Sequence, residues 1–300
     1  MEGGVSGVIT ERARLASSLN ALCDAQPFET GWYLRDLRRG VSADRRGSVV
    51  VPSASTRKIA ILMTALGDVH TGRLSLDRRL AIEARYQISD SGCMQHFRPG
   101  STLTLHDFLV MMIIVSDNVA TGTVADLVGL DAINAFCRSI GMTGTTHRAG
   151  IPQENYPLMP PGEVPPHDVS RLNDTTPAEV GHLLEAILKG GDDSDAAARL
   201  GVTPDLCRYA LDILSWQNLT ARLPSWLPTG TKVAHKTGTG GNAINDAGII
   251  FQNGRPLFVL TVYTYPVPRV LRNGEPGKAA ATAHIGRLSR ACWDALAEPE

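Results

Sequence analysis

Apolar residues recur with strand-like spacing near both ends of the chain and with helix-like spacing between them. The segments 31–37 and 47–52 are short runs rich in aromatic residues and valine, and a polar turn at 38–40 separates them, which predicts a β-hairpin. Three later runs with short turns between them predict strands at 232–236, 247–252 and 256–265. Helices are expected over 9–24 and about 279–297.

The middle of the chain has the periodicity of helices. Apolar residues from Ile59 to Leu66 cover one face of a helix that starts near Ser55 and stops at Gly72. A second helix should begin after an N-cap at Ser101 or Thr102. The helices expected in this region, after the one from Ser55, cover 104–115, 120–127, 132–140, 177–188 and about 204–219.

This order of elements predicts an α+β fold in one domain, residues 1–300, with two lobes. Residues about 1–55 and 205–300 should form an antiparallel sheet flanked by helices, and residues about 56–204 an all-helical lobe. Within the helical lobe, about 143–176 holds six of the 18 prolines and has little periodicity. A loop this long inside a compact domain is typical of a functional segment or an Ω-loop.

Charge and apolar run lengths exclude two classes of partner. The 300 residues carry 29 Lys and Arg against 30 Asp and Glu, a formal charge of −1 without basic blocks, so nothing predicts binding to nucleic acid. The longest strongly apolar run, Leu109 to Val115, is far shorter than the ~20 residues that cross a bilayer, so no membrane partner is expected.

Cysteine usage and the first residues bear on the compartment. The five cysteines are scattered and form no C-x-x-C pair, which is typical of free thiols in a reducing compartment. The first 25 residues hold no apolar core of the kind found in export signals. We therefore expect a cytoplasmic protein. The eight histidines show no metal-ligand spacing, and neither a metal nor an organic cofactor is implied.

The segment Ser55-Thr56-Arg57-Lys58 lies where a strand-like run meets a helix. Residues three apart share a helix face, so Lys58 would stack against Ser55. A serine hydroxyl becomes nucleophilic when a neighbour takes its proton, and a lysine whose pKa is lowered by burial and a second cation can do so. The helix N-terminus also offers free N–H groups to a developing oxyanion. The structural alternative is a capping serine with a solvated lysine one turn later.

Two further clusters suit the same chemistry. The segment 116–118 (Ser-Asp-Asn) follows an apolar helix and would place a hydroxyl and an amide at a lobe edge. The segment 236–239 (Lys-Thr-Gly-Thr) ends a predicted strand. Its lysine would keep Lys58 neutral and attract an anionic substrate group, and its glycine would let the substrate backbone lie against the strand. Each cluster alone could instead be an ordinary helix cap or turn.

With these three clusters in this order, the chain resembles the class A β-lactamases, serine hydrolases related to penicillin-binding proteins. The resemblance covers roughly residues 28–297. The spacing of 61 residues between Ser55 and Ser116 is also similar to that of the family. Further resemblance comes from the segments 100–121, 173–184 and 230–250. A two-lobed serine β-lactamase-like fold is thereby implied.

The resemblance also implies roles for these residues. Ser55 would be the acylated nucleophile, Lys58 would accept its proton, and Ser116 would relay a proton to the leaving nitrogen. Lys236 would supply the positive charge that binds the substrate carboxylate. The remaining substrate contacts would be Asn118 for the side-chain amide, Thr237 and Thr239 for the carboxylate, and Gly238. Backbone N–H groups of Ser55 and Thr239 would form the oxyanion hole.

The chain departs from the family in the long loop. Class A enzymes carry a glutamate in an R-x-E-x-x-L-N segment, where it activates the deacylating water, and this chain has no such segment. The family spacing from Asn118 falls near Glu154, although Arg148 precedes Glu154 by six residues instead of two. Glu163 is a second candidate, and either glutamate could simply be a solvated loop residue.

Three functions remain open on these grounds. The first is a β-lactamase that opens a lactam amide and then hydrolyses the acyl-enzyme. The second is a related esterase, amidase, D,D-peptidase or biosynthetic transacylase, which a cytoplasmic location would favour. The third is a lactam-binding protein that deacylates slowly. Each would act on a small molecule, a lactam or a related amide or ester with a carboxylate, and we expect a monomer.

Overall fold

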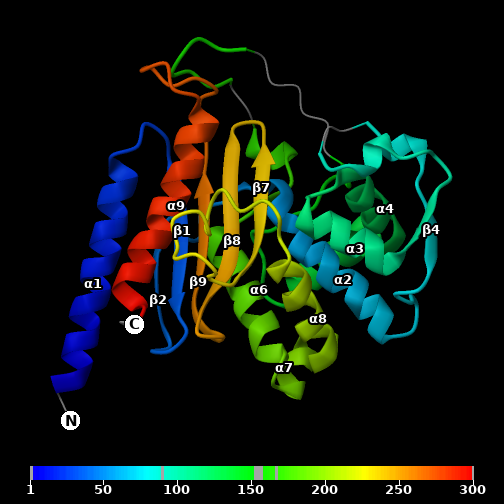
Figure 1. The fold of residues 1–300 in the computed structure, drawn as a ribbon, viewed down its shortest axis with the longest axis horizontal. Helices are drawn as coiled ribbons and strands as arrows, with labels where there is room; N and C mark the ends of the chain where they lie inside the picture. The colour runs from blue at the N-terminus through cyan, green and yellow to red at the C-terminus, as the bar shows by residue number, and fades with distance from the viewer. Residues whose placement is uncertain (1–2, 89–90, 152–157, 166–167, 299–300) are drawn as a thin grey trace.

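The computed structural model describes residues 3–88, 91–151, 158–165 and 168–298 (Figure 1). A five-stranded antiparallel sheet has the order β2-β1-β9-β8-β7. Its strands are β1 (Thr30–Asp36), β2 (Val41–Arg45), β7 (Val233–Gly240), β8 (Ala243–Gln252) and β9 (Arg255–Thr264). The predicted α+β fold, with strands from both ends of the chain in one sheet, is confirmed.

Helices cover both faces of this sheet. On one face, α1 (Gly3–Asp24) and α9 (Gly277–Leu296) lie side by side (Figure 1). Trp32 of β1 is fully buried in the core that this pair shares with the sheet. The next residue, Tyr33, faces the other side of the sheet, where its ring packs on Gly181 of α6 (Pro177–Gly190). A Cβ at Gly181 would lie 2.3 Å from that ring, so the absence of a side chain lets α6 approach the sheet.

The remaining helices surround α2 (Lys58–His70). Every residue from Ile59 to Leu66 is buried, because α2 contacts α3, α4, α5 and α8 around its circumference. These neighbouring helices are α3 (Leu105–Ile114), α4 (Asn118–Val128), α5 (Leu130–Ser139) and α8 (Pro204–Ser215), and the short α7 (Ser194–Arg199) packs against α6 and α8. Short 3-10 turns occur at Ala54–Arg57, Ala84–Tyr86, Met94–His96 and Val169–Arg171.

Three local predictions are wrong. The hairpin partner of β1 is Val41–Arg45, not 47–52: of the latter only Val51–Pro52 forms a strand, β3, which pairs with β6 (Asp174–Thr175). The N-cap of α3 is Thr104, not Ser101 or Thr102, because Thr104 and Asp107 form a reciprocal capping box. The helix expected to reach 219 ends at Ser215.

Further elements had no sequence signal. A small antiparallel pair joins β4 (Arg79–Ala81) to β5 (Thr102–Thr104), next to the start of α3.

All five cysteines are free thiols; Cys93 is exposed and the others are buried. Among the described residues no single helix is long and apolar enough to cross a membrane. Only α4 and α5 taken together reach that length and apolar composition, and they are bent by 80° at the break between them.

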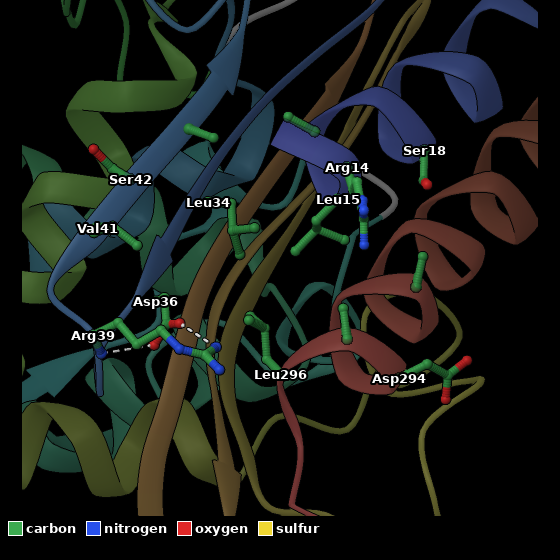
Figure 2. Close-up of a pocket in the computed structure, with 14 residues that line it drawn as sticks. Arg14, Leu15, Ser18, Leu34, Asp36, Arg39, Val41, Ser42, Asp294 and Leu296 are labelled. Carbon is green, nitrogen blue, oxygen red and sulfur yellow. Dashed lines mark hydrogen bonds and ion pairs between the residues drawn. The ribbon is translucent and has the colours of Figure 1, made fainter. Parts of the chain in front are cut away.

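A cavity of about 520 Å³ lies between α1, α9 and the β1–β2 hairpin. Figure 2 shows Leu15, Leu34 and Leu296 around it, with the ion pair of Arg39 and Asp36 at its edge. None of the residues that line this cavity belongs to the three sequence clusters described above.

Candidate active site

Ser55 lies in the tight turn Ala54–Arg57 that leads directly into α2. The turn begins with Ala54 in a left-handed conformation (φ +45°). The backbone N–H of Lys58 donates to the carbonyl of Ser55, so the two residues are one turn apart, as their spacing predicted. The Ser55 side chain is partly exposed, whereas Lys58 is buried. A partly exposed serine hydroxyl one turn before a buried lysine is an arrangement that suits nucleophilic catalysis.

Lys58 joins the first cluster to the second. Its Nζ donates to the backbone carbonyl of Ser116 at 2.7 Å and to Oδ1 of Asn118 at 2.8 Å, and it lies 3.1 Å from Oγ of Ser116. Burial lowers the pKa of Lys58 well below its usual range, and the positive charges of Lys236 and Arg57 lower it further. The amine therefore gives up its own proton more readily than an ordinary lysine, and the deprotonated form can accept one from a hydroxyl.

Ser116 itself has an unusual backbone conformation (φ +59°). It is held by its neighbour Asp117, whose Oδ2 accepts the backbone N–H groups of Cys93 and Met94, each at 2.8 Å. The other oxygen of Asp117 caps α4 by accepting from the N–H of Ala120 at 3.0 Å. Gly92 makes this wrapping possible, because a Cβ there would lie 2.2 Å from the Asp117 carboxyl group. Asp117, the middle residue of the second cluster, thus fixes the position of Ser116, the first residue of that cluster.

The third cluster lies on the edge strand β7, against the Ser55 turn. A Cβ at Gly238 would lie 3.1 Å from the carbonyl oxygen of Ser53 and 3.2 Å from Cβ of Ala54. Lys236 is fully buried and its Nζ donates to the carbonyl of Thr237 at 2.9 Å. Burial lowers the pKa of Lys236 to about 7, with Arg222 adding to the decrease and Asp246 opposing it. All three clusters therefore meet at one place, with Thr239 exposed at the end of the strand.

Arg222 is a site residue that the sequence did not reveal. Its buried guanidinium donates to the carbonyl of Gly238 at 2.7 Å, to the carbonyl of Asn245, and to Oγ1 of Thr239. It thus supports the end of β7 and adds a second cation near Lys236. A single arginine in a segment without periodicity carries no local signal, so only the fold identifies it.

A buried acid–base pair supports the same strand from β8. Nδ1 of His235 lies 2.9 Å from Oδ1 of Asp246, and the backbone N–H of Leu223 donates to Oδ2 of Asp246 at 3.1 Å. Burial raises the pKa of Asp246, but the charges of His235 and Arg222 and these hydrogen bonds outweigh it and leave the pKa below its usual value. His235 therefore has a buried structural partner within the sheet.

The long loop contains the two glutamate candidates. Glu154 lies outside the described residues. Glu163 is exposed and, among described residues, has no hydrogen bond to Ser55, Lys58 or Ser116. It lines a cavity next to Thr239 instead.

The base of the loop is tied to the body of the protein. Nη1 of Arg148 pairs with Asp174 at 2.7 Å, and Oδ1 of Asn173 accepts the backbone N–H of Arg148 at 2.6 Å. The buried Arg57, next to Lys58, donates to the carbonyl of Gly150. Gly150 stands two residues after Arg148, where the R-x-E pattern has its glutamate.

Comparison with known proteins decides the family. The model of the Beta-lactamase enzyme family matches residues 14–296, nearly the whole chain. The chain belongs to the beta-lactamase family. Within this family it is similar to beta-lactamase AER-1 of Aeromonas hydrophila, with 30% identity over 77% of this chain and 71% of that protein.

Solved structures of this beta-lactamase family have the same fold. A beta-lactamase from Sphaerobacter thermophilus is 25% identical, covers 94% of this chain and 96% of its own, and has a TM-score of 0.77. A mutant of PBP-A, solved as an acyl-enzyme complex with penicillin G, is 25% identical with the same coverage and a TM-score of 0.78. The predicted class A β-lactamase-like fold is confirmed.

Proposed function

We propose that this beta-lactamase family member is a serine hydrolase that opens β-lactam amides through an acyl-enzyme at Ser55. One observation carries the proposal: Lys58, a buried lysine with a strongly lowered pKa, follows Ser55 by one turn, and its amine lies 3.1 Å from the Ser116 hydroxyl. Such an amine can take a proton from one hydroxyl and pass it on through the other.

The acylation step uses these groups in turn. The Ser55 oxygen bonds to the lactam carbonyl carbon while its proton moves to Nζ of Lys58. Backbone N–H groups of Ser55 and Thr239 would stabilise the oxyanion. As the carbon–nitrogen bond breaks, Ser116 gives its proton to the leaving nitrogen and receives the one held by Lys58, which returns the lysine to its neutral state.

The substrate is held by the third cluster and Asn118. Lys236, with the hydroxyls of Thr237 and Thr239, would bind the substrate carboxylate, and Gly238 would let the substrate backbone approach β7. Arg222 adds positive charge here through its contact with Thr239. Asn118 would hold the side-chain amide of the substrate.

Deacylation is the open step, and the loop sequence supports a second candidate function. Water must attack the acyl carbon and release Ser55, which needs a base near that carbon. Gly150, which cannot act as a base, occupies the place two residues after Arg148. A lactam-binding protein that remains acylated is therefore the second candidate. In the hydrolase, Glu154 could supply the base that Gly150 does not provide.

Time-resolved intact mass spectrometry with benzylpenicillin tests acylation and separates the candidates. We expect an adduct of one lactam per chain that is absent in Ser55→Ala. An adduct that decays within seconds, together with many turnovers of a chromogenic cephalosporin, supports the hydrolase, and Glu154→Gln should then prolong the adduct. An adduct that persists for hours supports the binding protein.

Two results contradict the proposal. Cleavage of simple esters without any lactam adduct, abolished by Ser55→Ala, would indicate the esterase, amidase or transacylase class. Acylation that survives Ser55→Ala would refute the assignment of the nucleophile.

A monomeric state and a cytoplasmic location are also proposed. The five free thiols support the reducing compartment. Light scattering after gel filtration and fractionation of the native host test these two points.

A further inference from the structure

A second cavity adjoins the candidate active site at the end of β7. Its volume is about 540 Å³, and Thr239 forms part of its wall. The rest of the wall comes from three segments: the β7–β8 turn, residues 159–165 of the long loop, and residues 267–278 that lead into α9. Figure 1 shows the last two segments side by side beyond the ends of β7 and β8.

Hydrogen bonds hold these walls together. Asn242 in the β7–β8 turn and Val267 are joined twice, by Val267 N–H to the Asn242 carbonyl at 2.8 Å and by Nδ2 of Asn242 to the Val267 carbonyl at 2.7 Å. The N–H of Gly162 donates to the carbonyl of Val270 at 2.8 Å. A Cβ at Gly162, which has φ +84°, would lie 2.4 Å from the side chain of Arg272. The cavity is therefore preformed by the fold and does not depend on a ligand.

The lining of the cavity is apolar inside and mainly positive at its rim. Apolar surface comes from Met159, Ile244, Val267 and Val270 together with three prolines. Arg269 and Lys278 are exposed at the rim, and neither forms an ion pair with a described residue. Glu163 supplies one opposing charge. Such a site fits a molecule with an apolar chain that ends in an anion.

The direction of β7 indicates which part of a substrate would enter. If Lys236 and Thr237 bind the substrate carboxylate, the reacting carbonyl lies further along β7, and the acyl arm extends past Thr239. The strand advances about 3.3 Å per residue, so Thr239, at the wall of the cavity, lies roughly 10 Å along β7 from Lys236. A short acyl arm would stop before the cavity, whereas a chain of six carbons would enter it.

We propose that this cavity binds the acyl arm of the substrate and selects arms that are apolar along their length and end in a carboxylate. The proposal rests on the proposed function and names a substrate class for the same site. Arg269 and Lys278 would attract the distal carboxylate, and the apolar lining would cover the methylene groups.

Two penicillins with matched side chains test the proposal. One carries a hexanoyl arm and the other an adipoyl arm, which has the same number of carbons but ends in a carboxylate. The rate of Ser55 acylation at low salt is measured by intact mass. We expect the adipoyl compound to react about fivefold faster, since two exposed ion pairs of ordinary strength give a factor of this size. The Arg269→Gln/Lys278→Gln variant should lose that preference and keep its rate with the hexanoyl compound.

A second double variant controls for the overall charge of the protein. Arg138→Gln/Lys189→Gln removes the same charge at exposed positions on α5 and α6, and it should retain the preference. Equal rates for the two penicillins in the unaltered protein, or an equal loss of preference in both double variants, would overturn the proposal.

Binding measurements on Ser55→Ala separate this proposal from the proposed function. If neither penicillin acylates Ser55, the proposed function fails, and calorimetric affinities of the two compounds for Ser55→Ala still test the cavity. Tighter binding of the adipoyl compound that depends on Arg269 and Lys278 supports the cavity proposal even then. Equal affinities refute it.

Discussion

Replacing Asp117 by alanine should destabilise the protein strongly, because its carboxyl group is buried and accepts three backbone N–H groups. Two of those donors, Cys93 and Met94, lie in the loop that the carboxyl group holds against α4. Leaving a buried N–H unpaired costs about 1–3 kcal/mol, and loss of a helix cap costs about 1 kcal/mol. The expected decrease in the free energy of unfolding is therefore about 4 kcal/mol.

Asp193→Ala is the matched control. Asp193 caps α7 and also accepts two backbone N–H groups, from Asp195 at 2.8 Å and Ala196 at 3.1 Å, but it is exposed. Water can replace it, so we expect a loss of only about 1 kcal/mol. Urea unfolding followed by circular dichroism measures both, and Asp117→Ala should also melt roughly 6 °C lower than the unaltered protein.

The same substitution should slow acylation of Ser55, since Ser116 would lose the neighbour that holds its left-handed backbone. Asp193→Ala should acylate at the normal rate. If Asp117→Ala loses no more stability than Asp193→Ala, then the 91–94 loop is satisfied by water or by other groups, and the reasoning from buried hydrogen bonds is refuted.

Three further predictions concern cations around the site. The pKa of Lys236 is about 7, and under the proposed function its protonated form attracts the substrate carboxylate. The second-order rate of acylation should then fall about tenfold per pH unit well above pH 7, and Lys236→Arg should remove that decline. Arg222→Ala should cost about 2–4 kcal/mol in urea unfolding and weaken lactam binding, because three acceptors that include Thr239 lose their donor; normal stability and affinity would contradict this. Arg148→Ala leaves Asp174, whose pKa is raised by burial, without its cation. The free energy of unfolding should therefore be about 2–3 kcal/mol lower than that of the unaltered protein at pH 8, and the difference should shrink at pH 5, where protonation removes the buried charge. A difference independent of pH would show that the ion pair is not its source.

The parts of the fold that sequence predicted are those with a strong apolar period. β8 and β9 are buried on both faces along most of their length and contain long apolar runs, so they were found. β2 (Val41–Arg45) was missed because it is a half-exposed edge strand with polar and charged residues, a composition that protects sheet edges. The valines at 49–51 misled the prediction, since Val49 and Val50 are exposed and only Val51 pairs, with Thr175.

The candidate site was predictable to the extent that its residues sit in local clusters. Ser55 with Lys58, the Ser116 cluster and the Lys236 strand each carry their chemistry within a few residues, and the structure places the three together. Arg222 acts through contacts with distant backbone carbonyls, which sequence spacing does not encode. The role of Asp117 was also hidden, because its partners lie in a loop more than twenty positions earlier.

The pairing of β1 with β9 has a consequence for synthesis of the protein. Ser55 and Lys58 leave the ribosome early, but β7 follows some 180 residues later, and β1 waits still longer for β9. At about 10 residues per second the delay is roughly 20 s, during which β1 and β2 lack their neighbour in the sheet. A nascent chain therefore carries Ser55, the proposed nucleophile, long before the rest of the candidate site is complete. Covalent labelling by a lactam would therefore detect completed, folded molecules and would not label unfinished chains.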